Sequence, residues 1–261
     1  MDILTHTLSG VAVATCVASL MPTATGRWRL LLLGAVAGAF PDLDALSLWS
    51  GFDRSIGAYF GLAKGGAIYT GRWWYSHHAF LHSVAASLLL AGLWTLGRYG
   101  VNQLRQRHPP KQAYGLALLT FVLAYWAHLA GDLPTPDAYW GGVALFWPST
   151  DYVGGTGHVW WWHNYDVFLL ILLCVVFNIM ALACAKWLQQ ATPKLTCGMF
   201  VLTLGLVLYQ INTRQYDYAY SGNTPNYALM DEQARLEQQR ILGPRLYGYM
   251  RAFERRLPVY F

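Results

Sequence analysis

The chain contains 261 residues, of which 55% are hydrophobic and 12% are charged. Because soluble domains carry about 25% charged residues, this composition excludes an ordinary soluble enzyme and predicts an all-α membrane protein. The formal net charge is +5 at pH 7, but the Lys and Arg residues are spread over the connections and the tail instead of forming a dense run. The lipid bilayer is therefore an expected partner, whereas nucleic acid is not.

Six apolar stretches have lengths near the roughly 20 residues that cross a bilayer. They cover residues 3–21, 28–48, 79–97, 115–131, 166–188 and 197–212. We predict a polytopic helical bundle of about six transmembrane helices, forming one domain over residues 1–212, followed by a tail over residues 213–261. Pro41 interrupts the second stretch, and proline ends or kinks a helix.

Basic residues predict the orientation of the bundle, because short cytoplasmic connections are enriched in Lys and Arg. Four lie between the third and fourth stretches and two near the start of the second: Arg98, Arg105, Arg107, Lys111, Arg27 and Arg29. If these connections are cytoplasmic, residues 49–78 and 132–165 lie on the opposite face together with the N-terminus. The tail would also lie outside despite its seven Arg residues, since long tails follow the charge rule weakly.

Within the tail, apolar residues recur at helical spacing, opposite three arginines. The apolar positions are Leu246, Tyr249, Met250, Phe253 and Leu257, and the basic ones are Arg251, Arg255 and Arg256. This pattern is typical of an amphipathic helix that lies on a membrane surface. A helix that packs against a partner would show the same pattern, and the sequence supports both alternatives equally.

Ionisable residues lie in or at the ends of the first four apolar stretches, where they are costly: an Asp at mid-bilayer costs about 2.5–3.5 kcal/mol. They are His6, Asp42, Asp44, His82, His128 and Asp132, with His77 and His78 just before the third stretch. In the orientation predicted from Lys and Arg alone, all of them lie on the non-cytoplasmic face. Three carboxylates and several imidazoles suit zinc, manganese or iron(II). We expect one or two divalent ions, with zinc as the leading expectation.

The spacing of these residues predicts which of them bind one ion together. His128 and Asp132 are four residues apart and share one face of a helix. His78 and His82 have the same spacing, whereas His77 and His82 are five apart, which is about 140° around a helix. Helical geometry therefore favours His78, unless His77 precedes the helix.

Asp42 and Asp44 would point to opposite sides of a continuous helix. After Pro41, however, the chain either turns or begins a short helix, whose N-terminus favours carboxylates. Both side chains could then reach one centre.

These residues belong to five motifs in a fixed order: Thr-His-Thr-Leu-Ser-Gly at 5–10, Pro-Asp-Leu-Asp at 41–44, His-His-Ala-Phe-Leu-His-Ser at 77–83, His-Leu-Ala-Gly-Asp at 128–132 and Phe-Trp-Pro-Ser at 146–149. Their order and spacing resemble the YdjM-like family of bacterial inner-membrane proteins, which are predicted metal-dependent hydrolases and distantly similar to zinc-dependent phospholipases C. The resemblance implies a multi-pass protein of the bacterial inner (plasma) membrane. It also implies the site residues His6, Asp42, Asp44, His77, His82, His128 and Asp132.

The third motif departs from the family pattern His-Arg-Gly-x-Thr-His-Ser. His78 stands at the Arg position, Ala79 at the Gly and Leu81 at the Thr, while His77 and His82 keep both His positions. Whether His77 or His78 binds the metal therefore stays open.

We expect metal-activated water to attack a phosphoric or carboxylic ester. Asp42 or Asp44 would accept the proton of the water, and His77 or His78 would protonate the leaving group. Aromatic residues in the two outer connections suit a lipid or lipid-linked substrate, or else form a belt that anchors these connections at the membrane interface. They are Trp73, Trp74, Tyr75, Tyr139, Trp140, Trp147, Trp160, Trp161 and Trp162.

Two other functions fit the same residues. A transporter of metal ions or protons also needs Asp and His in the membrane, but it predicts a midplane site and inverted repeats. A non-catalytic scaffold would use a closed metal site only to join four helix ends. His158, His163 and Asp166 in the second outer connection are weaker candidates for the same site.

Overall fold

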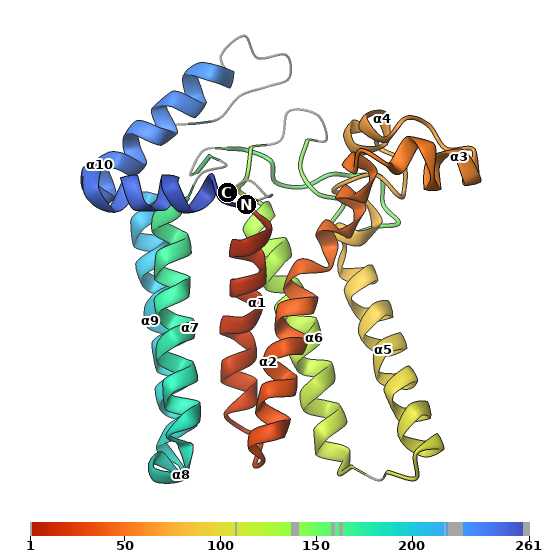
Figure 1. The fold of residues 1–261 in the computed structure, drawn as a ribbon, viewed down its shortest axis with the longest axis vertical. Helices are drawn as coiled ribbons and strands as arrows, with labels where there is room; N and C mark the ends of the chain where they lie inside the picture. Colours follow the sequence, from red (N-terminus) through yellow and green to blue (C-terminus); the bar gives the residue numbers. More distant parts are fainter. Residues whose placement is uncertain are drawn as a thin grey trace.

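The computed structural model describes residues 2–107, 109–136, 141–157, 160–161, 164–216, 218 and 227–257, and in these ranges the regular elements are helices (Figure 1). In chain order they are α1 (Ile3–Ala18), α2 (Ala24–Ala39), η1 (Pro41–Leu48), η2 (Phe52–Arg54), α3 (Ile56–Phe60), α4 (Gly65–Thr70), η3 (Phe80–His82), α5 (Val84–Leu104), α6 (Lys111–Asp132), α7 (Tyr165–Ala183), α8 (Ala185–Leu188), α9 (Ala191–Asn212) and α10 (Tyr227–Glu254). The prediction of an all-α membrane bundle is confirmed.

Four helices are long and apolar enough to cross a membrane, namely α5, α6, α7 and α9. A fifth span is formed if α2 and η1 are counted together, although they are bent by 50° relative to each other. The first predicted span is the shorter helix α1, which has 16 residues and a length of about 24 Å. Length and composition therefore support four or five of the expected six spans, and Figure 1 shows α1 running alongside them.

Small residues let α1 and α2 approach closely. A Cβ atom added to Gly10 would lie 2.3 Å from the carbonyl oxygen of Gly34, and one added to Gly38 would lie 2.6 Å from the carbonyl oxygen of His6. Gly34 and Gly38 are four residues apart and so share a face of α2, as in membrane helix pairs that pack through glycine. The contact brings the backbone of α2 directly against the start of α1.

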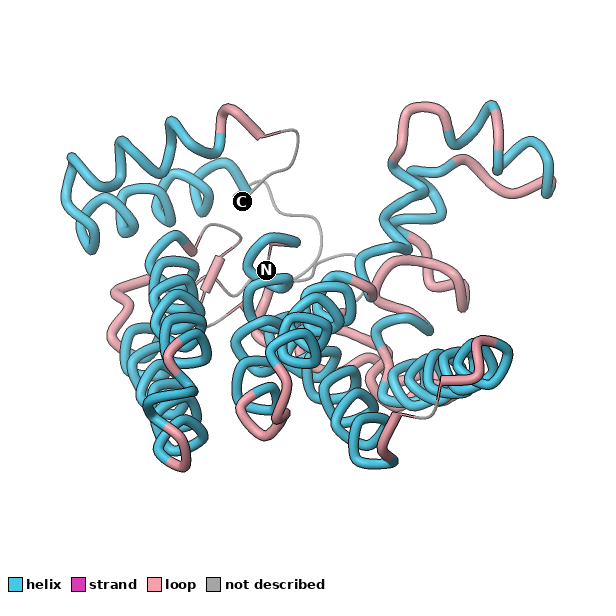
Figure 2. Tube along the Cα trace, turned by 60° about the horizontal axis from the view of Figure 1, so that its bottom comes forward, coloured by secondary structure: helices cyan, strands magenta, loops and turns pink. Residues whose placement is uncertain are grey.

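Helices α1, α2 and α6 pack together at the centre of the bundle, with α7 and α9 on one side and α5 at the edge (Figure 2). Phe121 and Tyr125 of α6 belong to the apolar core between these helices. A polar contact joins the other side, because the Asn178 amide donates to the Thr15 hydroxyl at 2.8 Å and to the Thr196 carbonyl at 3.2 Å. Hydrogen bonds of this kind hold helices together in hydrocarbon.

The connections at one end of the bundle carry short helices, and α10 lies at the same end (Figure 1). Helix α10 bends at Gly243, where φ is 72°, directly before Pro244. Met250 is buried against Tyr165 and Phe168 of α7. Of the remaining apolar tail positions Leu257 also packs there, whereas Leu246, Tyr249 and Phe253 are exposed. The amphipathic face is thus divided between the protein's own bundle and its surface.

Candidate metal centre

Four elements, α1, η1, η3 and α6, meet at the same place and carry the ionisable residues predicted from the sequence, with His82 in η3. His6 lies in the first turns of α1, while His128 and Asp132 lie in the last turns of α6. Asp42 and Asp44 lie in the first turn of η1. Pro41 starts η1 because it lacks the N–H that would continue α2, and the resulting bend turns both carboxylates toward the other helix ends.

Three ligand atoms form a compact triangle at the centre of the cluster. The Nε2 atoms of His82 and His128 are 3.3 Å apart, and Asp132 Oδ2 lies 2.9 Å from His128 Nε2 and 3.5 Å from His82 Nε2. Zinc–ligand bonds of 2.0–2.1 Å in a tetrahedral site separate neighbouring ligand atoms by about 3.3–3.4 Å. Two edges of the triangle are close to this spacing, whereas the 2.9 Å edge between His128 and Asp132 is shorter and would have to open slightly around a zinc ion.

Asp42 lies beside this triangle but farther from it. Its Oδ1 atom is 3.7 Å from His128 Nε2 and 3.8 Å from His82 Nε2. The side chain of Asp42 is 15% exposed, whereas those of His82 and His128 are fully buried and that of Asp132 is 4% exposed. Asp42 thus marks the accessible side of the cluster.

Hydrogen bonds on the opposite ring nitrogens orient the two central imidazoles. His128 Nδ1 lies 2.7 Å from the carbonyl oxygen of Gly38, which can only accept, so Nδ1 carries a proton, and in the neutral imidazole the lone pair is on Nε2. His82 Nδ1 lies 3.0 Å from Asp44 Oδ2. A backbone carbonyl and a carboxylate are the usual partners that fix metal-binding histidines.

His6 lies on the outer side of His128. The two rings stack with their centroids 3.7 Å apart, and His6 Nε2 is 2.9 Å from Asp132 Oδ1. Among the described residues the Nδ1 atom of His6, although buried, has no hydrogen-bond partner. His6, Asp42 and His128 form a second group able to hold a metal ion. Because only Nε2 of His128 is available, this group and the central triangle compete for it.

His77 and His78 lie before α5 and not within it. The i, i+4 spacing of a helix therefore does not apply to them. Residues 77–79 form turns, η3 follows, and α5 begins at Val84 after the Ser83 side chain caps its N-terminus by accepting from Ala86 N at 3.0 Å. The expected start of this span at residue 79 was therefore wrong. His78 has a φ of 62°, so its side chain is not placed by i, i+4 geometry.

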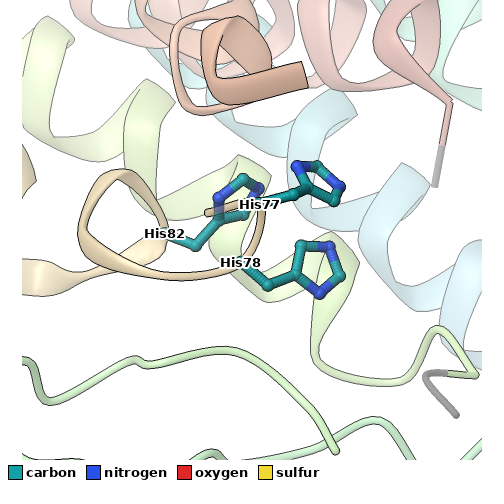
Figure 3. Close-up of side chains that lie close together, drawn as sticks. All are labelled: His77, His78 and His82. Atoms are coloured by element: carbon teal, nitrogen blue, oxygen red, sulfur yellow. The ribbon is translucent and has the colours of Figure 1, made fainter. Parts of the chain in front are cut away.

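Instead, the turn gathers three imidazoles from one short segment, as Figure 3 shows. His77, His78 and His82 form a third group of buried residues that could hold a metal ion. His77 Nδ1 lies 2.6 Å from Asp44 Oδ1, and the ring of His77 stacks on Tyr69 with centroids 4.6 Å apart. Asp44 thus contacts the Nδ1 atoms of His77 and His82 with its two oxygens, whereas Asp42 contacts the Nε2 side.

The charge balance of this segment differs between its two ends. Burial lowers the pKa of His77 to about 4, and the neighbouring His78 acts in the same direction, so His77 is a neutral imidazole near pH 7. Burial would also lower the pKa of His82, but the adjacent Asp44, together with Asp42 and Asp132, raises it to about 10. In the absence of a metal the carboxylates therefore hold a proton on His82. A divalent cation would supply the same positive charge.

The donor set fits a divalent metal. The buried His and Asp groups supply only nitrogen and oxygen atoms, and in each group of three these ligand atoms lie within 4.8 Å of one another. Nitrogen and oxygen ligands of this kind suit divalent metals. The predicted site residues His6, Asp42, Asp44, His77, His82, His128 and Asp132 are all brought together, and His78 joins them.

Other sequence candidates lie elsewhere. Asp166 is paired with Arg214 at 3.1 Å, so it supports the start of α7 and lies outside these metal-capable groups. His158 and His163 lie outside the described residues, as do Tyr139, Trp140 and Trp162. Trp73 and Trp74 are exposed, whereas Trp147 packs against Phe80, Trp160 donates to Thr135 and Trp161 lies near Asp231.

Two contributors to the site were missed in the sequence. One is the carbonyl of Gly38, for which the spacing of Gly34 and Gly38 predicts close helix packing but not the contact with His128. The other is Tyr125, whose hydroxyl donates to the carbonyl of Leu81 and so fixes the turn before His82. No pattern in the sequence pointed to that bond.

Comparison with known proteins supports the grouping of these motifs. No curated protein and no solved structure was found to be similar to the chain. The family model described as "YdjM inner membrane protein" matches residues 1–215. That range covers all four helix ends of the metal centre. The chain therefore belongs to the YdjM inner membrane protein family.

Proposed function

We propose that the protein is a membrane-embedded, metal-dependent hydrolase that cleaves an ester or phosphoester bond of a lipid or lipid-linked substrate. The observation that carries this proposal is the difference between the compact triangle of His82, His128 and Asp132 and the more distant, partly exposed Asp42. Catalytic zinc sites have three protein ligands and an open fourth position, whereas structural sites are closed by four.

In this proposal His82, His128 and Asp132 hold the metal, and zinc is the preferred ion. When bound, the metal lowers the pKa of water and polarises the ester. Asp42 stands at the open side and accepts the proton of the attacking water. Asp44 keeps His82 in the orientation that its Nδ1 contact shows.

His77 and His78 complete the opposite wall of the site. Both are buried and lie with His82 in one group. Because His77 is neutral near pH 7, we assign to His78 the transfer of a proton to a leaving group held beside the triangle. His6 supports the ring of His128 by stacking and contacts the second oxygen of Asp132.

The position of the cluster favours a substrate that arrives through the membrane. The residues of the cluster lie at helix ends. The neighbouring segment, residues 43–74, exposes large apolar side chains: Leu43, Leu46, Leu48, Trp49, Tyr59, Phe60, Trp73 and Trp74. Trp and Tyr side chains are enriched at membrane–water interfaces. The same position disfavours a transporter, whose site would lie at the midplane.

Deep burial of the ligands favours a second candidate, a scaffold whose metal joins the helix ends. His6, His82 and His128 are 0% exposed, and if Asp42 were a fourth ligand the shell would be closed. The two candidates differ in the role of Asp42. If Asp42 is a base, it is needed for turnover but not for metal binding. If Asp42 is a ligand, it is needed for metal binding.

The test is therefore Asp42→Asn, compared with Asp132→Ala and with the exposed Asp151→Asn as a matched control. Bound metal is measured in the purified protein, and hydrolysis is assayed on phospholipid and aryl-phosphoester substrates. We expect Asp42→Asn to keep the metal and lose at least about a hundredfold in turnover, and Asp132→Ala to lose both. A metal-loaded wild type that hydrolyses none of these substrates would favour the scaffold, and a metal-free wild type would refute both.

A further inference from the structure

A cavity of about 510 Å³ lies at the end of the bundle opposite the metal centre. It is enclosed by the turn between α1 and α2 and by the end of α7 with the start of α8, which Figure 1 shows at the bottom of the bundle. Its volume is within the range of about 300–1,000 Å³ that is usual for small-molecule sites. None of the residues that line it belongs to the metal centre.

Two cationic side chains line this cavity. Arg27 donates from Nε to the carbonyl of Met21 at 2.8 Å and from Nη1 to the carbonyl of Leu182 at 3.2 Å. These bonds fix the guanidinium between the α1–α2 turn and the last turn of α7. A guanidinium has five N–H donors, so three are left for a ligand within the part of the chain that the structure describes. Lys186 lies on the α8 side of the same cavity.

No acidic residue in the nearby sequence neutralises these cations. Residues 3–41, 54–131 and 167–216 contain neither Asp nor Glu, and the turns at this end of the bundle are built from these segments. The basic residues near this end of the bundle are instead Arg27, Arg29, Arg98, Arg105, Arg107, Lys111, Lys186 and Lys194. The cavity thus has an excess of positive charge that an anion would balance.

The remaining walls are apolar. Leu31, Ile179 and Leu182 line the side toward the bundle, and Trp28, which is 58% exposed, lies at the rim. Trp is enriched where membrane helices meet the headgroup region. A soluble anion would use only the cations, whereas a lipid would fill both the charged and the apolar parts.

From this combination we infer that the cavity binds an anionic phospholipid, with its phosphate between Arg27 and Lys186 and its acyl chains along Leu31 and Ile179. Basic pockets between transmembrane helices at the cytoplasmic side are known to bind anionic headgroups. The excess of Lys and Arg places this end of the bundle on that side. The inference concerns a site distinct from the metal centre and does not depend on hydrolysis.

Native mass spectrometry of the full chain in detergent tests the inference, with equal amounts of phosphatidylglycerol and phosphatidylcholine added. We expect preferential retention of phosphatidylglycerol. Lys186→Gln should lower that retention about fivefold, which corresponds to about 1 kcal/mol for one basic residue near a membrane surface. Arg27→Gln should have a similar effect, but it also removes bonds to two carbonyls, so its melting temperature must be measured in parallel.

The matched control is Arg105→Gln, which removes the same charge at the same end of the bundle but does not line the cavity. It should leave lipid retention unchanged. Equal losses in Lys186→Gln and Arg105→Gln would overturn the inference, because they would show a general effect of charge. Equal retention of both lipids, or displacement of phosphatidylglycerol by equimolar glycerol 1-phosphate, would also overturn it.

Discussion

The close contact of α1 with α2 predicts that a single methyl group at Gly38 disturbs both the fold and the metal centre. In Gly38→Ala the new Cβ would lie 2.6 Å from the His6 carbonyl oxygen and 3.0 Å from Gly10 Cα. Ordinary contacts of a Cβ begin near 3.4 Å, so the helices must separate by about 0.8 Å. Both neighbours are backbone atoms, which cannot rotate away.

The expected cost follows from these distances. Overpacking costs about 1–3 kcal/mol, and we expect the upper part of this range because backbone meets backbone. The higher helix propensity of Ala offsets about 1 kcal/mol of this cost, so the free energy of unfolding should fall by about 1–2 kcal/mol. The separation also moves the Gly38 carbonyl away from His128 Nδ1, now 2.7 Å distant. Loss of such an orienting partner weakens metal binding about 10–100-fold.

The assay compares the melting temperature and the bound metal of purified Gly38→Ala with those of Gly92→Ala. Gly92 lies in α5 with open space around it, so the same substitution there should leave both quantities unchanged or raise the melting temperature slightly. We expect Gly38→Ala to melt several degrees lower and to retain less metal. If the two variants behave alike, the close contact does not position His128 and the reasoning is refuted.

Three further predictions follow from the site and its surroundings. Asp44→Asn should weaken metal affinity about 10–100-fold, because Asp44 contacts the Nδ1 atoms of two histidines. Titration calorimetry measures the affinity, with Asp53→Asn as a control that changes a nearby aspartate outside the cluster. Dialysis against a chelator should lower the melting temperature of wild type and zinc should restore it, since a ligand that binds only the folded state stabilises it; an unchanged melting temperature would contradict a filled site. Arg214→Gln leaves the buried Asp166 without its ion-pair partner at a cost of about 3–5 kcal/mol. Because the backbone N–H of Asp166 donates to Gln238 of α10 at 3.1 Å, the variant should speed proteolytic release of α10 while bound metal stays constant. Loss of metal would show that Asp166 belongs to the centre.

The helical class and the approximate spans could be predicted because hydrophobicity along a membrane chain is a local property. Spans at 115–131 and 197–212 lie within α6 and α9. The start of α5 could not be predicted in this way. Val84 N donates to the carbonyl of Leu145 at 3.0 Å, and Ser83 caps the helix, so a contact with a residue far along the chain helps to end the turn. Apolar composition alone extended the helix back through residues 79–83.

The cluster itself was predictable because burying carboxylates in a membrane is costly, so residues that bear the cost must lie together. What the sequence could not separate is the role of each residue. Asp42 and Asp44 are two positions apart and chemically equal, yet one faces Nε2 atoms and the other Nδ1 atoms. The assignment depends on how η1 leaves α2, and η1 packs there against α4 and η3, which are distant in the sequence.

The same bend connects the packing of the membrane helices to the proposed chemistry. If α2 continued straight through Pro41, Asp42 and Asp44 would point to opposite sides of one helix, and one of them would face lipid. The 50° turn into η1 brings both onto the helix ends that carry His82, His128 and Asp132, and the side chain of Asp42 is 15% exposed whereas that of Asp44 is 4% exposed. In the proposed mechanism Asp44 orients a ligand while Asp42 faces the substrate, so the proposed catalytic role of the centre depends on this kink.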